Sequence, residues 1–109
     1  MTIAEIIEYV DNVKPNAFEE EDKLGWLNEL EKTIQTDVWD ETSDIVTHES
    51  TDEDTLLGAQ WDQVYYSYLE ARIALACGEF NEYANLMQTY NSFAGEYQRW
   101  YCRHYIDTD

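Results

Sequence analysis

The chain carries eighteen net negative charges and still has enough apolar residues to fold, and this pairing constrains it most. Twenty-four Asp and Glu residues oppose six Lys and Arg residues among 109. Disordered acidic segments contain few aromatic residues, whereas this chain has four Trp, nine Tyr and three Phe and is 44% hydrophobic. The sequence therefore predicts one compact domain surrounded by a strong negative field.

The charge balance argues against several classes of partner. Binding to nucleic acid needs basic side chains that displace counterions from phosphates, so we expect no specific nucleic-acid binding. Anionic membrane surfaces are disfavoured for the same reason, no stretch approaches the roughly 20 apolar residues of a membrane span, and we expect no signal peptide.

A helical reading places Cys77 and Cys102 roughly 35 Å apart, which excludes an internal disulfide and favours a reducing compartment.

Residue types and apolar periodicity predict an all-α fold, a small helical bundle of about four helices. Pro occurs once and Gly four times, and apolar residues recur at the helical period. The predicted helices span Thr2–Asn12, Glu19–Trp39, Trp61–Cys77 and Glu79–Tyr105. Pro15 ends the first helix, and Gly78 provides a turn between the last two. The fourth helix would be about 40 Å long against about 27 Å for the third, so its last turns, 96–105, should overhang.

The segment from about 40 to 60 is predicted to be a long acidic loop. No basic residue occurs between Lys32 and Arg72. The acidic residues of the loop are Asp40, Glu41, Asp44, Glu49, Asp52, Glu53 and Asp54. Connections of this length within a compact domain tend to be functional or disordered. We expect an excursion from the bundle, with room for one short strand near 45–47.

The sequence contains no pattern typical of catalysis or metal binding. An EF-hand reading that starts at Asp52 fails, because the residues at its positions 5, 6 and 12 are Leu56, Leu57 and Gln63. His48 has no second His or Cys at ligand spacing, so we interpret it as a solvent-exposed loop histidine. A phosphate-binding Gly-rich loop and a GxSxG elbow are also missing. We therefore expect no enzymatic activity, no metal and no cofactor.

The overhanging end of the fourth helix has the composition of a protein–protein interface, in which Tyr, Trp and Arg are enriched. The candidate interface residues here are Arg99, Trp100, Tyr101, Arg103 and Tyr105. His104 would be helix-terminal or interfacial. One hypothesis is that Arg99 and Arg103 of one copy contact the acidic loop of the next. The loop residues concerned are Asp40, Glu41, Asp44, Asp52, Glu53 and Asp54. The alternative is a local ion pair between Glu96 and either arginine.

Several short segments together have a recognisable pattern, namely Thr2–Val10, Lys14–Asn16, Trp26–Glu31, Tyr65–Ala71, Gly78–Tyr83 and Trp100–Tyr101. They resemble segments of small head–tail connector proteins of tailed phages and prophages. The resemblance covers almost the whole chain and rests on structural motifs rather than catalytic ones. The middle loop departs from the family pattern, because it has Thr and Asp where related chains have more Pro and Tyr.

The resemblance implies a virion structural protein at the head–tail interface, made in the cytoplasm of the host bacterium. Such proteins form a ring of identical copies, dodecameric by resemblance, beneath the portal vertex. They complete the DNA-filled head and dock the tail, with the portal protein and a tail-side connector as partners and without a cofactor. An acidic channel wall that repels DNA phosphates agrees with the charge of this chain.

Two other functions fit the sequence less well. The alternative is an acidic DNA-mimic inhibitor, such as a phage anti-CRISPR or anti-restriction protein, which would fill a basic nucleic-acid channel. The negative charge is concentrated on the first helix, the start of the second and the loop, and this asymmetry disfavours full mimicry. A transcriptional or chaperone-like adaptor is a third interpretation, with little in the sequence to favour it.

Overall fold

The computed structural model describes residues 1–106 and confirms a small all-α bundle. Its helices are α1 (Ile3–Val13), α2 (Glu20–Thr33), α3 (Asp62–Ala76) and α4 (Phe80–Tyr101). A π-helical turn continues two of them: η1 (Ile34–Val38) follows α2, and η3 (Cys102–Ile106) follows α4. A short 3-10 turn, η2 (Ala59–Trp61), precedes α3. Within the described residues, no helix combines the length and the apolar character that a membrane crossing needs.

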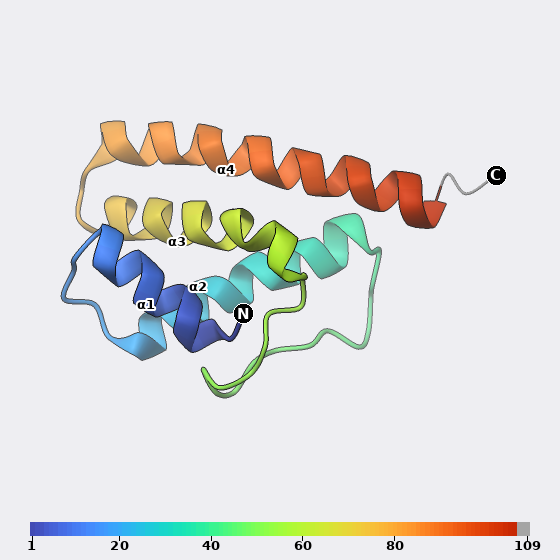
Figure 1. Ribbon diagram of the computed structural model, residues 1–109, viewed down its shortest axis with the longest axis horizontal. Coiled ribbons are helices and arrows are strands. Elements are labelled where there is room, and N and C mark those ends of the chain that lie inside the picture. Colours follow the sequence, from blue (N-terminus) through green and yellow to red (C-terminus); the bar gives the residue numbers. More distant parts are fainter. Residues whose placement is uncertain (107–109) are drawn as a thin grey trace.

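The central helix of the bundle is α3, which packs against α1, α2 and α4. Figure 1 shows α3 and α4 as an antiparallel hairpin, with α4 as an outer layer and with α1 and α2 on the other side of α3. Gly78 makes the hairpin turn with a φ of 77°, a conformation that glycine adopts without steric cost. Lys14, which follows α1, connects the end of α1 to this turn through ion pairs of 2.9 Å to Glu79 and 3.0 Å to Glu82.

The core forms where the apolar stripes of α1, α2 and α3 meet. In α1 the stripe predicted from helical spacing is buried, and a capping box starts the helix: Glu5 N donates to Thr2 Oγ1 at 3.2 Å and Thr2 N to Glu5 Oε1 at 2.9 Å. The principal core residues are Ile3, Ile6, Ile7, Val10, Leu27, Leu30, Ile34, Val64, Tyr65, Leu69 and Ile73. Burial of these side chains is the main force that holds the three helices together.

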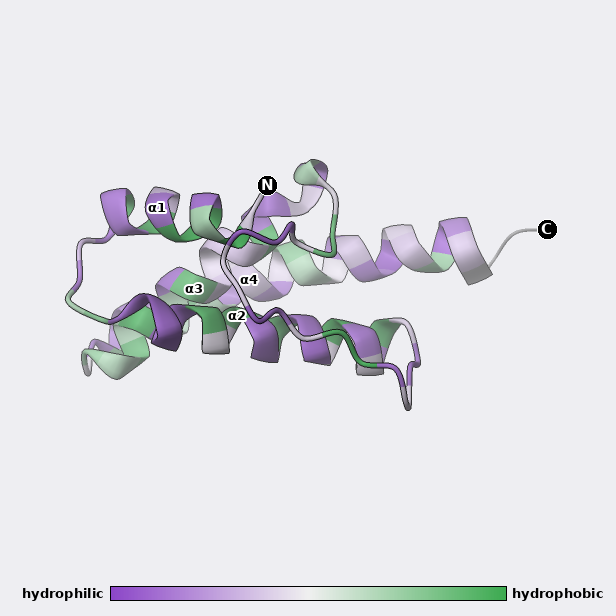
Figure 2. Ribbon diagram, turned by 90° about the horizontal axis from the view of Figure 1, so that it is seen from below, coloured by the Kyte–Doolittle hydropathy of each residue, from purple (hydrophilic) through white to green (hydrophobic). Residues whose placement is uncertain are grey.

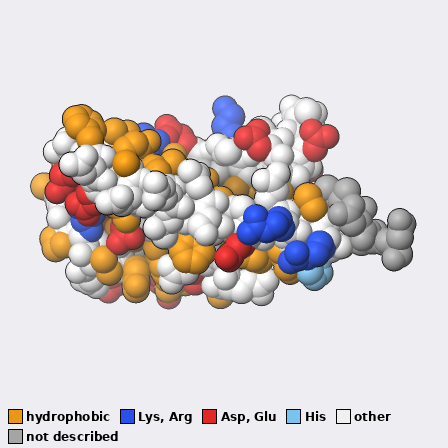
Figure 3. All heavy atoms as spheres, turned by 90° about the horizontal axis from the view of Figure 1, so that it is seen from above, with side chains coloured by type: hydrophobic (Ala, Val, Ile, Leu, Met, Phe, Trp, Pro, Cys, Tyr) orange, Lys and Arg blue, Asp and Glu red, His pale blue; other side chains and the backbone are white. Residues whose placement is uncertain are grey.

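The outer helix α4 is buried far less than the other helices. Tyr97 is its one buried residue among 22, and Phe80 at its start is 66% exposed. Figure 3 views the molecule from the α4 side and shows Lys, Arg and His side chains gathered toward the end where the described chain finishes. The last turns of α4 and η3 contain three basic residues, Arg99, Arg103 and His104.

Two predictions about the middle of the chain are wrong. Residues 45–47 form no strand; the one β-bridge in the described chain pairs Thr2 with Asp54. The loop is also not an excursion, because it lies back against the bundle. Thr55 N donates to the Met1 carbonyl at 2.9 Å, and Ile3 N donates to the Glu53 carbonyl at 2.9 Å. Figure 2, seen from the side opposite α4, shows the loop running across the helices.

Candidate interaction surfaces

The acidic loop is held by polar side chains that project from one face of α2 and η1. Asn28 and Gln35 are seven residues apart and therefore share a helix face. The amide of Asn28 accepts from His48 N at 2.9 Å and donates to the His48 carbonyl at 3.0 Å. Gln35 makes the equivalent pair with Val46, at 2.8 and 3.0 Å. The two amides thus satisfy the loop backbone as a neighbouring strand would.

A buried ionic cluster lies between these two amides. Glu31 is fully buried, and its Oε1 lies 2.5 Å from Nε2 of His48. Its other oxygen accepts from the Tyr65 hydroxyl at 2.6 Å and from Leu56 N at 2.7 Å. Burial, together with the Glu31 charge, raises the pKa of Tyr65. His48 is only 4% exposed, so its interpretation as a solvent-exposed histidine is wrong.

Of the acidic loop residues predicted to form an interface, Glu53 faces inward. Its Oε1 lies 3.0 Å from Nδ1 of His48, and its Oε2 accepts from the backbone N–H groups of Glu49 and Ser50 at 2.9 and 3.0 Å. The His48 hydrogen bond and then these backbone donors lower the pKa of Glu53. The remaining predicted loop residues, Asp40, Glu41, Asp44, Asp52 and Asp54, are exposed.

The end of α4 extends past α3 but is not a bare overhang (Figure 1). Trp39, just after η1, donates from Nε1 to the Tyr97 hydroxyl at 2.8 Å and stacks on Tyr101 at 6.3 Å between centroids. Trp61, just before α3, packs edge-on against Tyr97 at 5.2 Å and lies 5.6 Å from Trp100. The overhang prediction therefore missed the two tryptophans that flank the loop and cover this end of the helix.

Among residues 1–105, the cationic face of the same turns has no acidic partner. Arg99 and Arg103 are exposed, one helical turn apart, and form no ion pair with any residue of 1–105. The proposed local pair with Glu96 is thus not formed. The Arg99 guanidinium folds back over Gly95, with Nη1 3.4 Å from where a Cβ would stand. By contrast Lys23 and Arg72 pair with Asp11 and Glu29, respectively.

The last predicted interface residues close the aromatic cluster. Trp100 and Tyr101 are half-buried, whereas Tyr105 is 62% exposed. His104 stacks on Trp100 at 4.6 Å and its Nδ1 lies 2.8 Å from the Trp100 carbonyl. The end of α4 therefore has an aromatic side toward the bundle and a cationic side toward solvent, and Tyr105 lies at the exposed edge.

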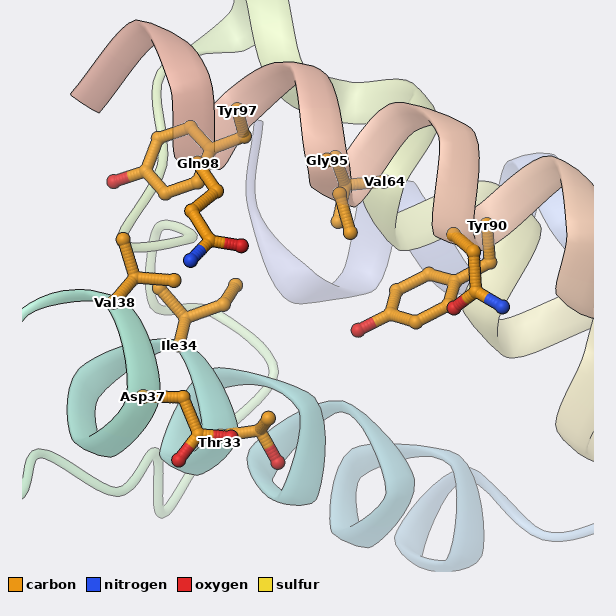
Figure 4. A pocket seen from close by; sticks show the side chains of 11 residues that line it. Thr33, Ile34, Asp37, Val38, Val64, Tyr90, Gly95, Tyr97 and Gln98 are labelled. Atoms are coloured by element: carbon orange, nitrogen blue, oxygen red, sulfur yellow. The ribbon is translucent and has the colours of Figure 1, made fainter. Parts of the chain in front are cut away.

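A groove of about 360 Å³ runs between η1 and α4 (Figure 4). Ile34, Val38 and Tyr90 give it an apolar floor, and Asp37 is the charged residue of its lining. Burial raises the pKa of Tyr90 to about 12. Within the described residues no group of three or more His, Cys, Asp or Glu side chains could hold a metal ion.

Comparison with protein-family models, with curated proteins and with solved structures finds no match to this chain. The residues that sequence reasoning missed are the buried anchors of the loop, Asn28, Glu31, Gln35 and His48. One signal was available: Glu31 stands four residues after Leu27 and three before Ile34, inside an apolar stripe. A carboxylate at such a position is buried and needs hydrogen-bond donors, which the loop supplies.

Proposed function

We propose that the protein is a head–tail connector of a tailed phage or prophage, forming a ring below the portal that completes the head and docks the tail. The observation that carries the proposal is the cationic face of Arg99 and Arg103, which has no carboxylate partner within residues 1–105, in a chain of net charge −18. In so acidic a protein these arginines have many carboxylates to pair with, yet they meet none within residues 1–105. A partner that supplies carboxylates fits this face.

A second copy of the chain is such a partner. The turn of the acidic loop lies on the side of the bundle opposite α4 (Figure 1), and it exposes Asp52 and Asp54. A contact between different faces of identical subunits is heterologous, and heterologous contacts generate rings when the rotation closes. This arrangement is the one that a connector ring requires. It also leaves other exposed carboxylates free to face a channel through which DNA passes.

The test is co-assembly of the purified protein with the portal of its phage, followed by mass-resolved chromatography. The Arg99→Glu/Arg103→Glu variant should lose self-association or portal binding by about tenfold or more, since contact charge pairs contribute on this scale. The matched control combines Lys32→Glu, Ala17→Glu and Asn81→Asp, all at exposed positions. Both variants add four negative charges, so only the location of the charge differs.

Salt dependence gives a second readout. Repulsion between whole subunits acts over tens of ångströms and is screened at about 0.1 M salt, whereas pairs in contact are screened less. Association should therefore be strongest at intermediate ionic strength and weaker both below and above it. Failure to bind portal and to self-associate at every ionic strength would exclude the connector function.

The exposed carboxylates also fit one other function, that of an acidic DNA mimic. The first turn of α2 presents Glu20, Glu21 and Asp22 to solvent, as the loop presents its own carboxylates. A row of negative charge of this kind fits a basic nucleic-acid channel. Tight binding to a DNA-targeting nuclease, competed by DNA and unaffected by the Arg99→Glu/Arg103→Glu change, would favour this function over the connector.

A further inference from the structure

We propose that His48 is a pH-sensitive clasp that holds the acidic loop on the bundle through Glu31 and Glu53. The inference does not depend on the connector function, because all the contacts concerned are made within one copy of the protein. It follows from the position of one imidazole ring between two carboxylates. The loop is released when the imidazolium of His48 loses one of its two ring N–H protons and becomes neutral. It is also released when the Glu53 carboxylate takes up a proton.

The hydrogen-bond pattern fixes the protonation of the ring. An ionised carboxylate only accepts hydrogen bonds, and a neutral imidazole has one donor and one acceptor nitrogen. Nε2 of His48 faces Glu31 at 2.5 Å and Nδ1 faces Glu53 at 3.0 Å. With both carboxylates ionised, both ring nitrogens must carry a proton. The clasp is therefore an imidazolium between two anions.

The surroundings of Glu31 make its ionised form the one that fits. The Tyr65 hydroxyl and the Leu56 N–H both donate to Oε2 of Glu31, at 2.6 and 2.7 Å. His48 is then the group that satisfies Oε1. The charged and titratable groups that face the ring are thus Glu31 from α2 and Glu53 from the loop itself, with Tyr65 of α3 behind Glu31.

Loss of one ring proton removes the positive charge that neutralises the buried Glu31 carboxylate. Glu31 has no exposed surface, and a buried charge that has lost its oppositely charged partner is strongly unfavourable. Glu31 is fixed in the last turn of α2, whereas His48 and Glu53 belong to a segment without helix or strand. The lowest-cost relief is separation of the loop from α2, which lets water reach all three groups.

The acid side of the clasp is set by Glu53. The His48 hydrogen bond, the largest cause, and two backbone N–H donors lower the pKa of this carboxyl. A carboxyl whose folded pKa lies below its unfolded value stabilises the docked loop at higher pH, and this stabilisation is lost as the pH falls through the folded pKa. Protonation of Glu53 therefore weakens the hold on the loop from the acid side.

Release of the loop would alter two surfaces at once. The Asn28 and Gln35 amides would lose their backbone partners at His48 and Val46. The first N–H groups of α1 would also lose acceptors, because Ile3 N and Ala4 N donate to the carbonyls of Glu53 and Thr51, both at 2.9 Å. The clasp therefore links the protonation of one ring to the position of the loop carboxylates.

The test is an NMR pH titration of the intact chain combined with amide hydrogen exchange. The chain has two histidines, and the exposed His104 is an internal reference for His48. We expect the amides of Val46, His48 and Leu56 to lose protection by about tenfold or more as the His48 ring deprotonates. Protection in the α3 core, at Leu69 for example, should hold over the same range. Unchanged protection of the loop amides while His48 titrates would overturn the inference.

Variants at the outer carboxylate keep the test independent of folding. His48→Gln removes the titratable ring but could unfold the chain, whereas Glu53 is 42% exposed and its replacement by glutamine is mild. A glutamine amide at this position can still contact the ring but carries no titratable carboxyl, so Glu53→Gln should remove the loss of loop protection on the acid side. Glu49→Gln is the matched control, because Glu49 is exposed in the same loop. Equal pH dependence in Glu53→Gln and Glu49→Gln would exclude the clasp.

Discussion

Trp39 and Tyr97, 58 residues apart, are joined by a hydrogen bond of 2.8 Å from the indole nitrogen to the phenolic oxygen. This contact connects the end of η1 with the last turns of α4, and Tyr97 also lines the groove of Figure 4. Tyr97 is the one buried residue of α4. The pair therefore fixes the angle at which the aromatic end of α4 rests on the bundle.

A double-mutant cycle at this pair should detect the coupling. Tyr97→Phe removes the acceptor and Trp39→Phe removes the donor, and each change leaves an aromatic ring in place. We expect a coupling energy of about 0.5–1.5 kcal/mol in urea unfolding, the net value of a typical hydrogen bond. Additive effects of the two changes would show that the bond does not stabilise the fold.

Removal of the Tyr65 hydroxyl should cost more than its size suggests. Tyr65→Phe deprives Glu31 of one donor and leaves Leu57 N, 3.1 Å from that hydroxyl, without its acceptor. Unsatisfied buried groups cost about 1–3 kcal/mol, so we expect a loss of that order in the free energy of unfolding. Tyr9→Phe is the control, since Tyr9 is exposed and keeps its stacking on Tyr66 at 4.0 Å. A similar loss in both variants would argue against the role of Glu31.

Two glycines should respond to alanine with opposite signs. Gly78 has a φ of 77°, where a Cβ is strained, so Gly78→Ala should destabilise the protein by about 1–2 kcal/mol. Gly25 lies in α2 with open space around its Cβ position, so Gly25→Ala should stabilise the protein by about 0.5–1 kcal/mol. Thermal unfolding of both variants measures the two signs, and a loss at both positions would contradict the account of Gly25.

Replacement of Glu70 should stabilise the protein in a pH-dependent way. Burial raises the pKa of this carboxyl above its ordinary value of 4.5, while Lys14 opposes the shift. A folded pKa above the unfolded one means that stability falls as the pH rises through that interval. Glu70→Gln should thus exceed the wild type in stability at about pH 7 and match it at about pH 4.

The control for this comparison is Glu96→Gln. Glu96 is exposed, so its replacement reduces the net charge equally without relieving burial. Urea unfolding at both pH values measures the two variants. If Glu96→Gln gains as much stability at neutral pH as Glu70→Gln, the effect comes from the overall charge and not from burial of Glu70.

The helices were predictable because their signals are local. The helical period of the apolar residues and the turn at Gly78 both appear in the structure, and helix bounds differ by about one residue except at the ends of α2 and α4. There the chain continues as π-helical turns, η1 and η3. Apolar periodicity does not mark such single π-helical turns, which are rare beside α-helical ones.

The site was predicted only in part, because its contacts are non-local. The composition of 99–105 indicated an interface, and Arg99 and Arg103 are indeed exposed and unpaired within residues 1–105. The loop was misjudged because its acidic residues suggested full solvation. Partners that lie 17 to 25 positions away in the sequence, as Glu31 does from His48 and Leu56, leave no periodic signal.

The shallow burial of α4 determines how well this helix tolerates amino-acid substitutions during evolution. A substitution on its outer face removes almost no core contact, because Tyr97 alone among its 22 residues is buried. Surface changes away from special features usually alter stability by less than about 0.5 kcal/mol. The helix can therefore acquire a new binding specificity through successive substitutions while α1, α2 and α3 keep the chain folded.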